Sequence, residues 1–407
     1  MDQSLLKEEY QRNRERYLAE WKEYLRFKSV SGVPEYESQC RACAGWLLSH
    51  LGDLGFVGQI VETSGLPLVL AEYQVNSDAP TVLFYGHYDV QPPEPLEEWK
   101  TDPFEPTLVG DRVYARGAMD NKGQSFYALK ALETLIEHNA LKYNVKILLE
   151  GEEECGSSGI SKLLVDGFDA DISADYLLVC DTLSLPDGRT VVVMGLKGLV
   201  AFTLEMYGAN TDLHSGMHGA CVPNPARGIA ELVASFHRVD GSVAVEGFYD
   251  GVKEPSPEQV ALAEGAYFGA AEYEKIVGVA PLSGETRYSP AVRFGFRPTL
   301  DINGIGSGYT GTGNKTVLPR KAIAKVTCRL VAGQDPASVV NSIREHVARF
   351  TPVGLRSEVV EVDLGGKALC LDPSLPNIQR VSELLRSVEA QNPAYQWVGA
   401  SVPVVPL

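Results

Sequence analysis

Short apolar runs that end at acidic or imidazole side chains constrain this chain most strongly. Between Leu51 and Leu149, such runs alternate with helical segments, and a further run precedes Asp181. The runs cover residues 66–72, 81–85, 144–150 and 176–180, and the clearest helical segment covers 124–137. This alternation indicates an α/β domain whose mixed central sheet is flanked by helices. In α/β sheets, ligands bind beyond the carboxyl ends of the strands, which is where the polar residues fall.

The pattern changes after Gly198 to a smaller α+β unit with a ferredoxin-like arrangement. Strands are expected at 199–207, 321–330 and 357–362, and helices at 225–236 and 337–350. We therefore expect a first domain made of residues 1–197 and 368–407, interrupted by an inserted domain of residues 198–367. Residues 240–314 are rich in Gly, Pro and Tyr, with one clear helix at 257–266. Long excursions of this kind are typical of lids or binding loops.

Composition excludes several classes of partner. The formal charge is −17, from 36 basic and 53 acidic residues, whereas nucleic acids and anionic membranes are bound mainly by Lys and Arg. The apolar runs fall far short of the roughly 20 residues that span a bilayer. Seven cysteines, an odd number in a long chain, indicate reduced thiols and a cytoplasmic location. Cys40 and Cys43 form a C-x-x-C, but an apolar helical run follows them, which favours buried helix cysteines.

His87 and Asp89 follow an apolar strand, and residues two apart in extended chain point the same way. A neutral imidazole suits zinc, and a carboxylate that accepts its second N–H fixes the tautomer and raises the basicity of the ligand. The H-x-D pair alone is also compatible with an incidental structural role. Its interpretation depends on the acidic residues elsewhere in the chain.

Three further acidic positions support a metal site. Asp120 lies in a run of small residues before a helix, where it could bridge two cations or cap the helix. Residues 150–154 hold four glutamates, and crowded carboxylates raise one another's pKa unless cations neutralise them; a solvated acidic loop is the alternative. Asp181 ends another strand and adds a hard oxygen ligand. Such groups at the ends of successive strands indicate one shared site.

Five ordered motifs give the chain a family resemblance. They read G-H-Y-D-V at Gly86, A-R-G-A-M-D-N-K-G at Ala115, E-G-E-E-E-C-G-S at Glu150, V-C-D-T at Val179 and D-L-H-S-G at Asp212. Together they resemble the carnosinase, aminoacylase and succinyl-diaminopimelate desuccinylase family of dinuclear metallopeptidases, over nearly the whole chain. The spacing of prolines and glycines is most similar to the dipeptidase branch.

The resemblance implies a hydrolase that cleaves the amide bond of dipeptides or short peptides with a metal-bound water. It implies two divalent metal ions, zinc first, with manganese or cobalt as alternatives. His87, Asp120 and Asp181 would hold one ion, and Asp120 would bridge to a second ion held by Glu154. Glu153 would be the general base, and Asp89 would orient His87. Metal polarisation of the carbonyl and a carboxylate beside the attacking water are mutually consistent chemistry.

The resemblance also assigns residues of the inserted domain, which it makes a lid and a homodimerisation domain. His214 would stabilise the oxyanion, in several members at the active site of a partner subunit; a turn histidine bonded locally is the alternative. Arg329 would grip the substrate's terminal carboxylate with its planar fork, or be merely solvated. Thr316 and Ser401 match further substrate-lining positions.

One departure concerns the last metal ligand. Family members supply it from a histidine beyond a G-G-S-I-P-like motif, which here reads G-A-S-V-P at Gly399, and no histidine follows Ser401. We therefore expect the C-terminal part of the catalytic domain to be truncated and the second metal site to lack a ligand. An N-acyl amino acid deacylase or amidase, and a non-catalytic homologue that binds peptide or forms a dimer scaffold, remain alternatives.

Two other motifs are interpreted as structural. G-S-G-Y-T-G at Gly306 matches the dinucleotide fingerprint, but that motif needs a preceding strand and a following helix, and we expect neither. Ser157 and Ser158 are expected to cap a helix that begins near Ile160.

Overall fold

The structure is a computed structural model that describes residues 3–167, 171–182, 184–185, 187–267, 269–389 and 391–399. The chain divides into two compact units, the first ending at Thr182 and the second following it. This division groups residues that lie close together in space. The assignment of residues 1–197 and 368–407 to one domain stays a prediction.

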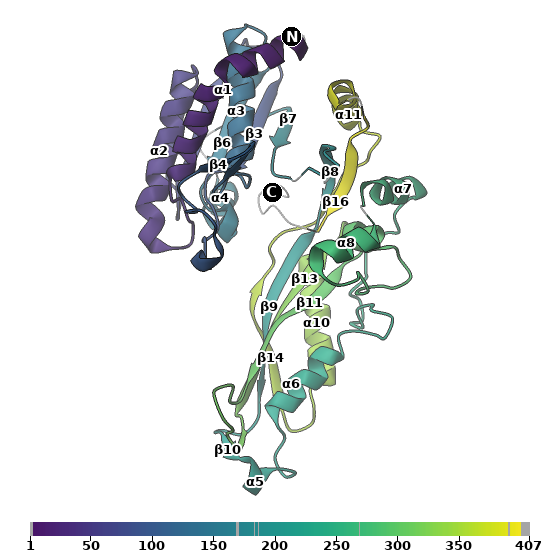
Figure 1. Cartoon of the computed structure of the whole chain (residues 1–407). Helices are drawn as coiled ribbons and strands as arrows, with labels where there is room; N and C mark the ends of the chain where they lie inside the picture. The colour runs from purple at the N-terminus through teal and green to yellow at the C-terminus, as the bar shows by residue number, and fades with distance from the viewer. Residues whose placement is uncertain are drawn as a thin grey trace. The chain divides into compact units, whose positions relative to one another are not determined.

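The first unit is built on a five-stranded mixed sheet with the order β1-β2-β6-β3-β7. Figure 1 labels three of these strands, β6, β3 and β7. Strand β3 runs parallel to both β6 and β7, while β2 is antiparallel to β6 and to β1. The mixed central sheet expected from the sequence is confirmed. Its strands are β1 (Val57–Val61), β2 (Leu68–Tyr73), β3 (Thr81–His87), β6 (Asn144–Glu150) and β7 (Tyr176–Val179).

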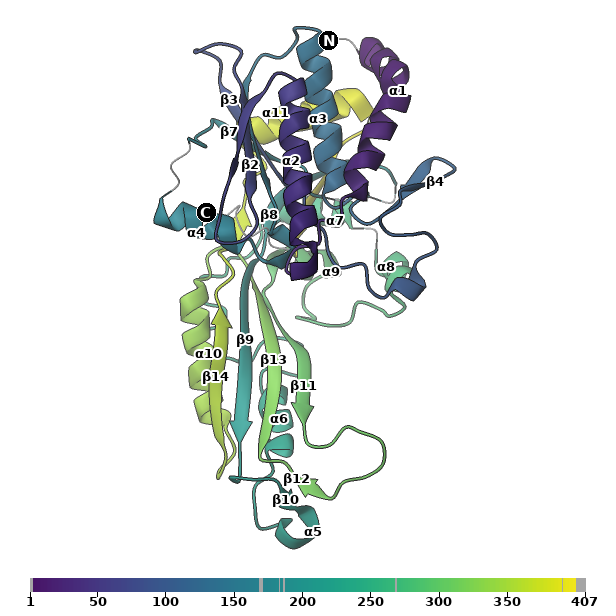
Figure 2. The ribbon, with the colours of Figure 1, turned by 90° about the vertical axis from the view of Figure 1, so that its left-hand side faces the viewer.

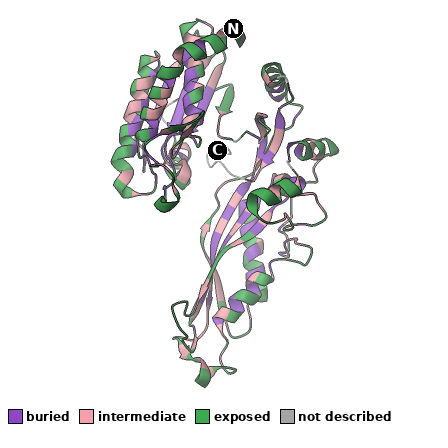
Figure 3. Cartoon of the chain, in the orientation of Figure 1, coloured by how far each residue is buried: buried purple, intermediate pink, exposed green. Residues whose placement is uncertain are grey.

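Helices pack on this sheet through an apolar core. In helix α2 (Glu37–Asp53) the buried positions include Cys40, Cys43, Leu47 and Leu51, which confirms the two cysteines as core residues. They pack with Val69, Phe84, Ile147 and Leu149 of the central strands. Figure 3 colours the chain by burial. Full burial of one such leucine contributes about 1.5–3 kcal/mol. The other elements of this unit are α1 (Gln3–Arg26), α3 (Lys122–Glu137), α4 (Ser158–Asp166) and the hairpin β4 (Thr107–Val109) and β5 (Arg112–Tyr114).

The second unit contains a four-stranded antiparallel sheet with the order β11-β13-β9-β14. With its two helices the connectivity is β-α-β-β-α-β, which is the ferredoxin-like split motif (Figure 2). Alternate residues of β9, from Val200 to Met206, are buried against those helices. The elements are β9 (Gly198–Tyr207), α6 (Pro225–Ala234), β11 (Thr299–Ser307), β13 (Lys321–Leu330), α10 (Pro336–Phe350) and β14 (Arg356–Asp363).

A three-stranded sheet, order β15-β8-β16, completes the second unit. Trp397 and Met194 are buried with Phe296 in its own small core. The strands are β8 (Val191–Leu196), β15 (Leu369–Cys370) and β16 (Ala394–Val398), and the helices of this region are α7 (Pro257–Ala266), α8 (Ala270–Val277), α9 (Pro290–Phe296) and α11 (Pro376–Glu389).

Between residues 240 and 314 the sequence prediction was incomplete. Helix α7 lies where it was expected, but α8, α9 and the edge strand β11 were missed. The two helices are short, and β11 has one buried residue and contains Gly304 and Gly306, so it lacks the alternation that marks a strand. A strand therefore does precede the G-S-G-Y-T-G motif, contrary to expectation. Within the described residues, the chain continues from it to β12 (Val317–Leu318) and not to a helix.

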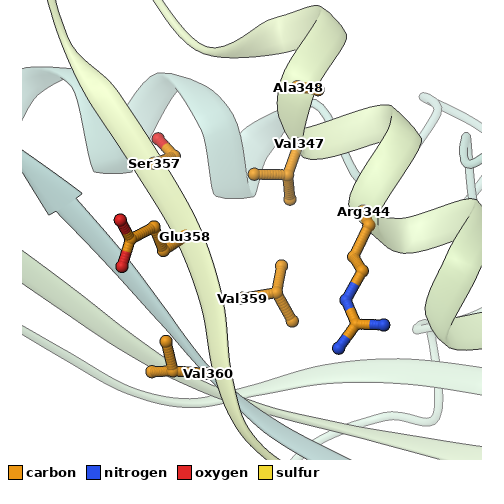
Figure 4. A pocket seen from close by; sticks show the side chains of 7 residues that line it. All are labelled: Arg344, Val347, Ala348, Ser357, Glu358, Val359 and Val360. Carbon is orange, nitrogen blue, oxygen red and sulfur yellow. The ribbon is translucent and has the colours of Figure 1, made fainter.

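A pocket of about 350 Å³ lies between α10 and the edge strand β14. Val359 packs toward the core beneath α10, while Glu358 points to the other side of the strand (Figure 4). The lining has one carboxylate and one guanidinium and holds neither histidine nor cysteine, so we assign no chemistry to it. No helix among the described residues is long and apolar enough to cross a membrane.

Candidate metal centre

Strand register brings the predicted ligands to one edge of the first sheet. His87, the last residue of β3, lies opposite Glu150, the last residue of β6. On the other side of β3, Tyr85 lies opposite Val179, so Asp181 follows the end of β7 by two residues. Because the three strands are parallel, their carboxyl ends meet at the same edge.

The imidazole of His87 is the centre of the cluster. Its Nε2 lies 3.2 Å from Asp120 Oδ1, 3.6 Å from Asp181 Oδ2 and 3.8 Å from Glu153 Oε2. This nitrogen is buried and makes no hydrogen bond. His87, Asp120 and Asp181 offer ligand atoms that all lie within 4.8 Å of one another. A buried, unbonded nitrogen facing several carboxylate oxygens fits a divalent cation, which would satisfy all of them.

Asp89 organises the opposite side of the imidazole. Its Oδ1 lies 3.1 Å from His87 Nδ1, and both side chains are fully buried. The same carboxylate accepts the backbone N–H groups of Glu153, at 3.3 Å, and Glu154, at 3.1 Å. Asp89 therefore fixes both the histidine and the start of the short helix η3 (Glu153–Cys155) that carries the two glutamates.

Glu154 is oriented differently from the three clustered ligands. Its Oε2 accepts a hydrogen bond from Gln91 Nε2 at 2.8 Å. Burial raises the pKa of Glu154, and the negative charge of Asp120 adds to this effect. Glu154 is therefore close enough to Asp120 for the two charges to interact. That Glu154 binds a metal ion stays a prediction.

The charges of this edge perturb one another. Burial raises the pKa of Glu153 to about 8, and the charges of Asp181 and Glu154 add to it while His87 opposes it. Burial alone would lower the pKa of His87. The neighbouring carboxylates of Asp120, Asp181 and Asp89 have the opposite and larger effect, so the pKa of His87 is well above its usual value. A bound cation would therefore displace a proton from His87 and stabilise the carboxylates in their charged form.

The structure tests three structural interpretations of these motifs. Asp120 does not cap helix α3, because the N-cap residue is Asn121. Ser157 does stand at the N-cap position of α4, but its hydroxyl makes no cap hydrogen bond there; it donates to Glu150 Oε1 at 2.9 Å. Glu150 also accepts the hydroxyl of Tyr85, so the acidic run contains one fully buried carboxyl group and is not simply a solvated loop.

Sequence reasoning missed the amide side chains around the centre. Gln91 contacts Glu154, and Asn121 and Gln124 bond to the segments that carry His87 and Asp181. Asn121 lies in the A-R-G-A-M-D-N-K-G motif, directly after Asp120. Gln124 lies in the first turn of α3, four residues after Asp120, and this nearness in the chain was the available signal.

A second acidic cluster, Glu20, His50 and Glu133, already has its cation. Lys130 Nζ donates to Glu20 Oε2 at 2.5 Å and to Glu133 Oε2 at 2.7 Å, and it lies 2.9 Å from His50 Nε2. Since an ammonium group occupies the centre of this cluster, it offers no room for a metal ion.

The predicted substrate residues lie in the second unit, at two separate places. His214 Nδ1 accepts the backbone N–H of Gly216 at 3.0 Å, and its Nε2 lies 3.2 Å from Thr316 Oγ1. These residues belong to the small sheet of β10 (Leu213–His214) and β12, at the far end of β13 from Arg329. The structure therefore brings His214 and Thr316 together but not Arg329. Ser401 lies outside the described residues.

Arg329 occupies the open face of its sheet, in register with Thr299 of β11. The alternation of exposed and buried residues along β13 is as predicted. Thr299 also lines a larger pocket of about 770 Å³, together with Lys197 and Asp301. Arg329 thus lies next to a cavity wall of mixed charge.

Comparison with known proteins decides the family. The profile of peptidase family M20/M25/M40 matches residues 83–394, more than half of the chain. The chain belongs to this family. Its curated relatives include the rat (Rattus norvegicus) Beta-Ala-His dipeptidase, 32% identical over 69% of this chain, and the Cys-Gly metallodipeptidase dug1 of Schizosaccharomyces pombe, 31% identical over 70%. The chain spans 58% and 60% of the length of these two relatives.

A solved M20 structure agrees with the architecture. The M20 family metallo-carboxypeptidase Sso-CP2 of Sulfolobus solfataricus is 31% identical, with a TM-score of 0.86 over 95% of this chain and 87% of that one. Because the match covers 95% of this chain, it includes residues of both units, and the mixed α/β architecture agrees with that structure.

Proposed function

We propose that this chain is a metal-dependent hydrolase that cleaves the amide bond of dipeptides or short peptides. One observation carries the proposal: buried His87 Nε2 makes no hydrogen bond, although oxygens of Asp120, Asp181 and Glu153 lie within 3.8 Å. Left unneutralised, such crowded charges are costly, whereas a divalent cation stabilises them.

His87, Asp120 and Asp181 would hold one ion, and Asp120 would bridge to a second ion held by Glu154. A nitrogen and several carboxylate oxygens suit zinc, and manganese or cobalt would accept the same donors. When bound, the ions supply Lewis acidity that polarises the scissile carbonyl and lowers the pKa of a water.

Glu153 would act as the general base. Its carboxylate faces His87 from the ligand side, and burial raises its pKa to about 8. A bound cation would lower that pKa and so favour the charged carboxylate, which is the form that accepts a proton from water. Asp89 would hold His87 and Glu153 in place, since it accepts hydrogen bonds from the His87 ring and from the backbone N–H of Glu153.

On the substrate side, Arg329 would bind the terminal carboxylate, and His214 would bind the developing oxyanion with Thr316 beside it. These groups lie at opposite ends of β13, whose ten residues span about 30 Å. A dipeptide is only about 7 Å long, so one substrate cannot reach both groups of the same second unit. We therefore propose a homodimer, formed through residues 198–367, in which His214 and Thr316 serve the partner's site.

The relatives support peptide substrates with a free carboxylate. Two are named as dipeptidases and one as a carboxypeptidase. The seven cysteines are all free thiols, which supports the proposed cytoplasmic location.

The test is hydrolysis by the purified chain of β-Ala-His, Cys-Gly and N-acetyl amino acids, after chelation and after reloading with Zn²⁺, Mn²⁺ or Co²⁺. We expect metal-dependent cleavage of the dipeptides. Cleavage confined to the N-acetyl amino acids would favour a deacylase, and bound metal without any turnover would favour a non-catalytic peptide-binding homologue.

A further inference from the structure

The segment that carries Asp181 lies beyond the last strand pairing of β7, at Val179. Two side-chain amides from the start of α3 hold it instead. Asn121 Nδ2 donates to the carbonyl oxygen of Cys180 at 2.8 Å, and Gln124 Nε2 donates to the carbonyl oxygen of Thr182 at 2.9 Å. The backbone carbonyls of the residues directly before and after Asp181 therefore accept hydrogen bonds from the start of one helix.

Asn121 also reaches the other ligand segments. Its Oδ1 accepts the backbone N–H of His87 at 3.2 Å, and the residue directly follows Asp120 in the chain. Asn121 Nδ2 additionally donates to Gln124 Oε1 at 3.1 Å, which links the two amides. One side chain thus contacts or adjoins the backbone of all three clustered ligands.

Burial and close packing give these amides defined positions. Asn121 is fully buried and Gln124 is 5% exposed. A Cβ added at Gly86 would lie 2.8 Å from Asn121 Oδ1, so the glycine before His87 leaves the space that the amide occupies. A carboxylate at position 121 or 124 would place an acceptor against a carbonyl acceptor and lose the N–H donor.

We infer that Asn121 and Gln124 form an amide clamp that sets the spacing of His87, Asp120 and Asp181 and so tunes the affinity of the metal centre. They are positioning residues: they touch the backbone of the ligand segments and not the ligand atoms. The inference rests on the proposed metal centre. Hydrogen-bonded partners of ligands typically change metal affinity 10- to 100-fold, and the clamp orients the same ligands through their backbone.

The test uses Asn121→Asp and Gln124→Glu in the full chain, with Asn144→Asp as the matched control. Asn144 is a similar amide in the same unit: it accepts from the backbone of Val75 and Asn76 and donates to the carbonyls of Asn76 and Ala79. It begins β6, at the end of the strand away from Glu150. The control therefore loses comparable hydrogen bonds far from the ligands.

Co²⁺ binding is measured by calorimetry and by the visible absorption spectrum of the ion, alongside the melting temperature of the metal-free protein. We expect both clamp variants to bind Co²⁺ roughly 10- to 100-fold more weakly, with altered spectra. Asn144→Asp is expected to lower the melting temperature while leaving affinity and spectrum unchanged. If Asn121→Asp fails to fold, Gln124→Glu decides, because it leaves the His87 contact intact.

Unchanged Co²⁺ affinity and spectrum in a folded clamp variant would overturn the inference, as would an equal loss in Asn144→Asp. Failure of the unaltered chain to bind Co²⁺ would instead refute the proposed metal centre itself, so the two failures are distinguishable.

Discussion

Asp89 Oδ1 lies 3.1 Å from His87 Nδ1, with both side chains excluded from solvent. Because a carboxylate only accepts hydrogen bonds, Nδ1 carries the proton in the neutral imidazole and the lone pair belongs to Nε2. That is the nitrogen that faces Asp120 and Asp181. One hydrogen bond thus selects the tautomer that can bind metal.

Replacing Asp89 with Asn should weaken metal binding about 10- to 100-fold, since the imidazole loses its charged acceptor. Calorimetric titration with Zn²⁺ measures the effect. Asp78→Asn, in an exposed loop of the same unit, is the control. Equal affinities for the Asp89 variant and the unaltered chain would show that the pair does not support the metal.

Replacing Glu153 with Gln should lower kcat by about 10²- to 10⁴-fold, because the base is lost while the shape of the site is kept. Metal content should stay unchanged in elemental analysis. Glu152→Gln is the matched control, since Glu152 Oε2 accepts the backbone N–H of Gly159 at 3.0 Å and does not face His87. Persistent turnover in the Glu153 variant would remove it from the role of base.

Glu150 should make the metal-free protein less stable as pH rises. Burial raises the pKa of Glu150 to about 7, although hydrogen bonds from Tyr85 and Ser157 oppose the shift. An unfolded glutamate titrates near 4.3, so between about pH 4.5 and 7 the folded state binds more protons and its stability falls with pH. Glu150→Gln should remove this slope, so that the free energy of unfolding above pH 7 rises by roughly 4 kcal/mol at most. Urea unfolding at pH 5 and pH 8 measures it; parallel pH profiles for the two proteins would contradict the assignment.

Replacing Arg329 with Ala should raise KM for dipeptides with a free carboxylate by roughly 10- to 100-fold, since a charge-assisted hydrogen bond contributes about 1.5–3 kcal/mol. Substrates with an amidated terminus should be unaffected. Lys325→Ala, on the same face of β13 and paired with Glu361 at 2.6 Å, controls for loss of surface charge. A similar rise in KM for both substrate types would argue against carboxylate recognition.

Glu285 and Arg297 form a buried ion pair in the second unit, with N–O distances of 2.7 and 3.1 Å. Glu285→Ala should cost about 3–5 kcal/mol, because it leaves a buried guanidinium without its main partner. The exposed pair of Glu272 and Lys275 provides the control, for which Glu272→Ala should change stability by less than about 1 kcal/mol. Chemical denaturation compares the two; equal effects would mean that Arg297 is solvated.

The central strands of the first unit could be predicted because each is a continuous apolar run. Strand β6 occupies the predicted residues, and β3 extends the predicted run by two residues to His87. Strand β11 could not be predicted, because it is an edge strand whose pairing with β13 comes from backbone hydrogen bonds and not from apolar side chains.

The sequence by itself determined which residues are candidates for the metal centre, because apolar runs followed by His87, Glu150 and Asp181 mark strand ends. Only the tertiary structure decided which of them meet. The parallel register of β3, β6 and β7 sets His87 among Asp120, Asp181 and Glu153, while Glu154 faces Gln91. The tertiary structure also decided that Asn121 and Gln124 hold the loop of Asp181. These hydrogen bonds join residues some 60 positions apart, so they depend on spatial approach and leave no periodic trace in the sequence.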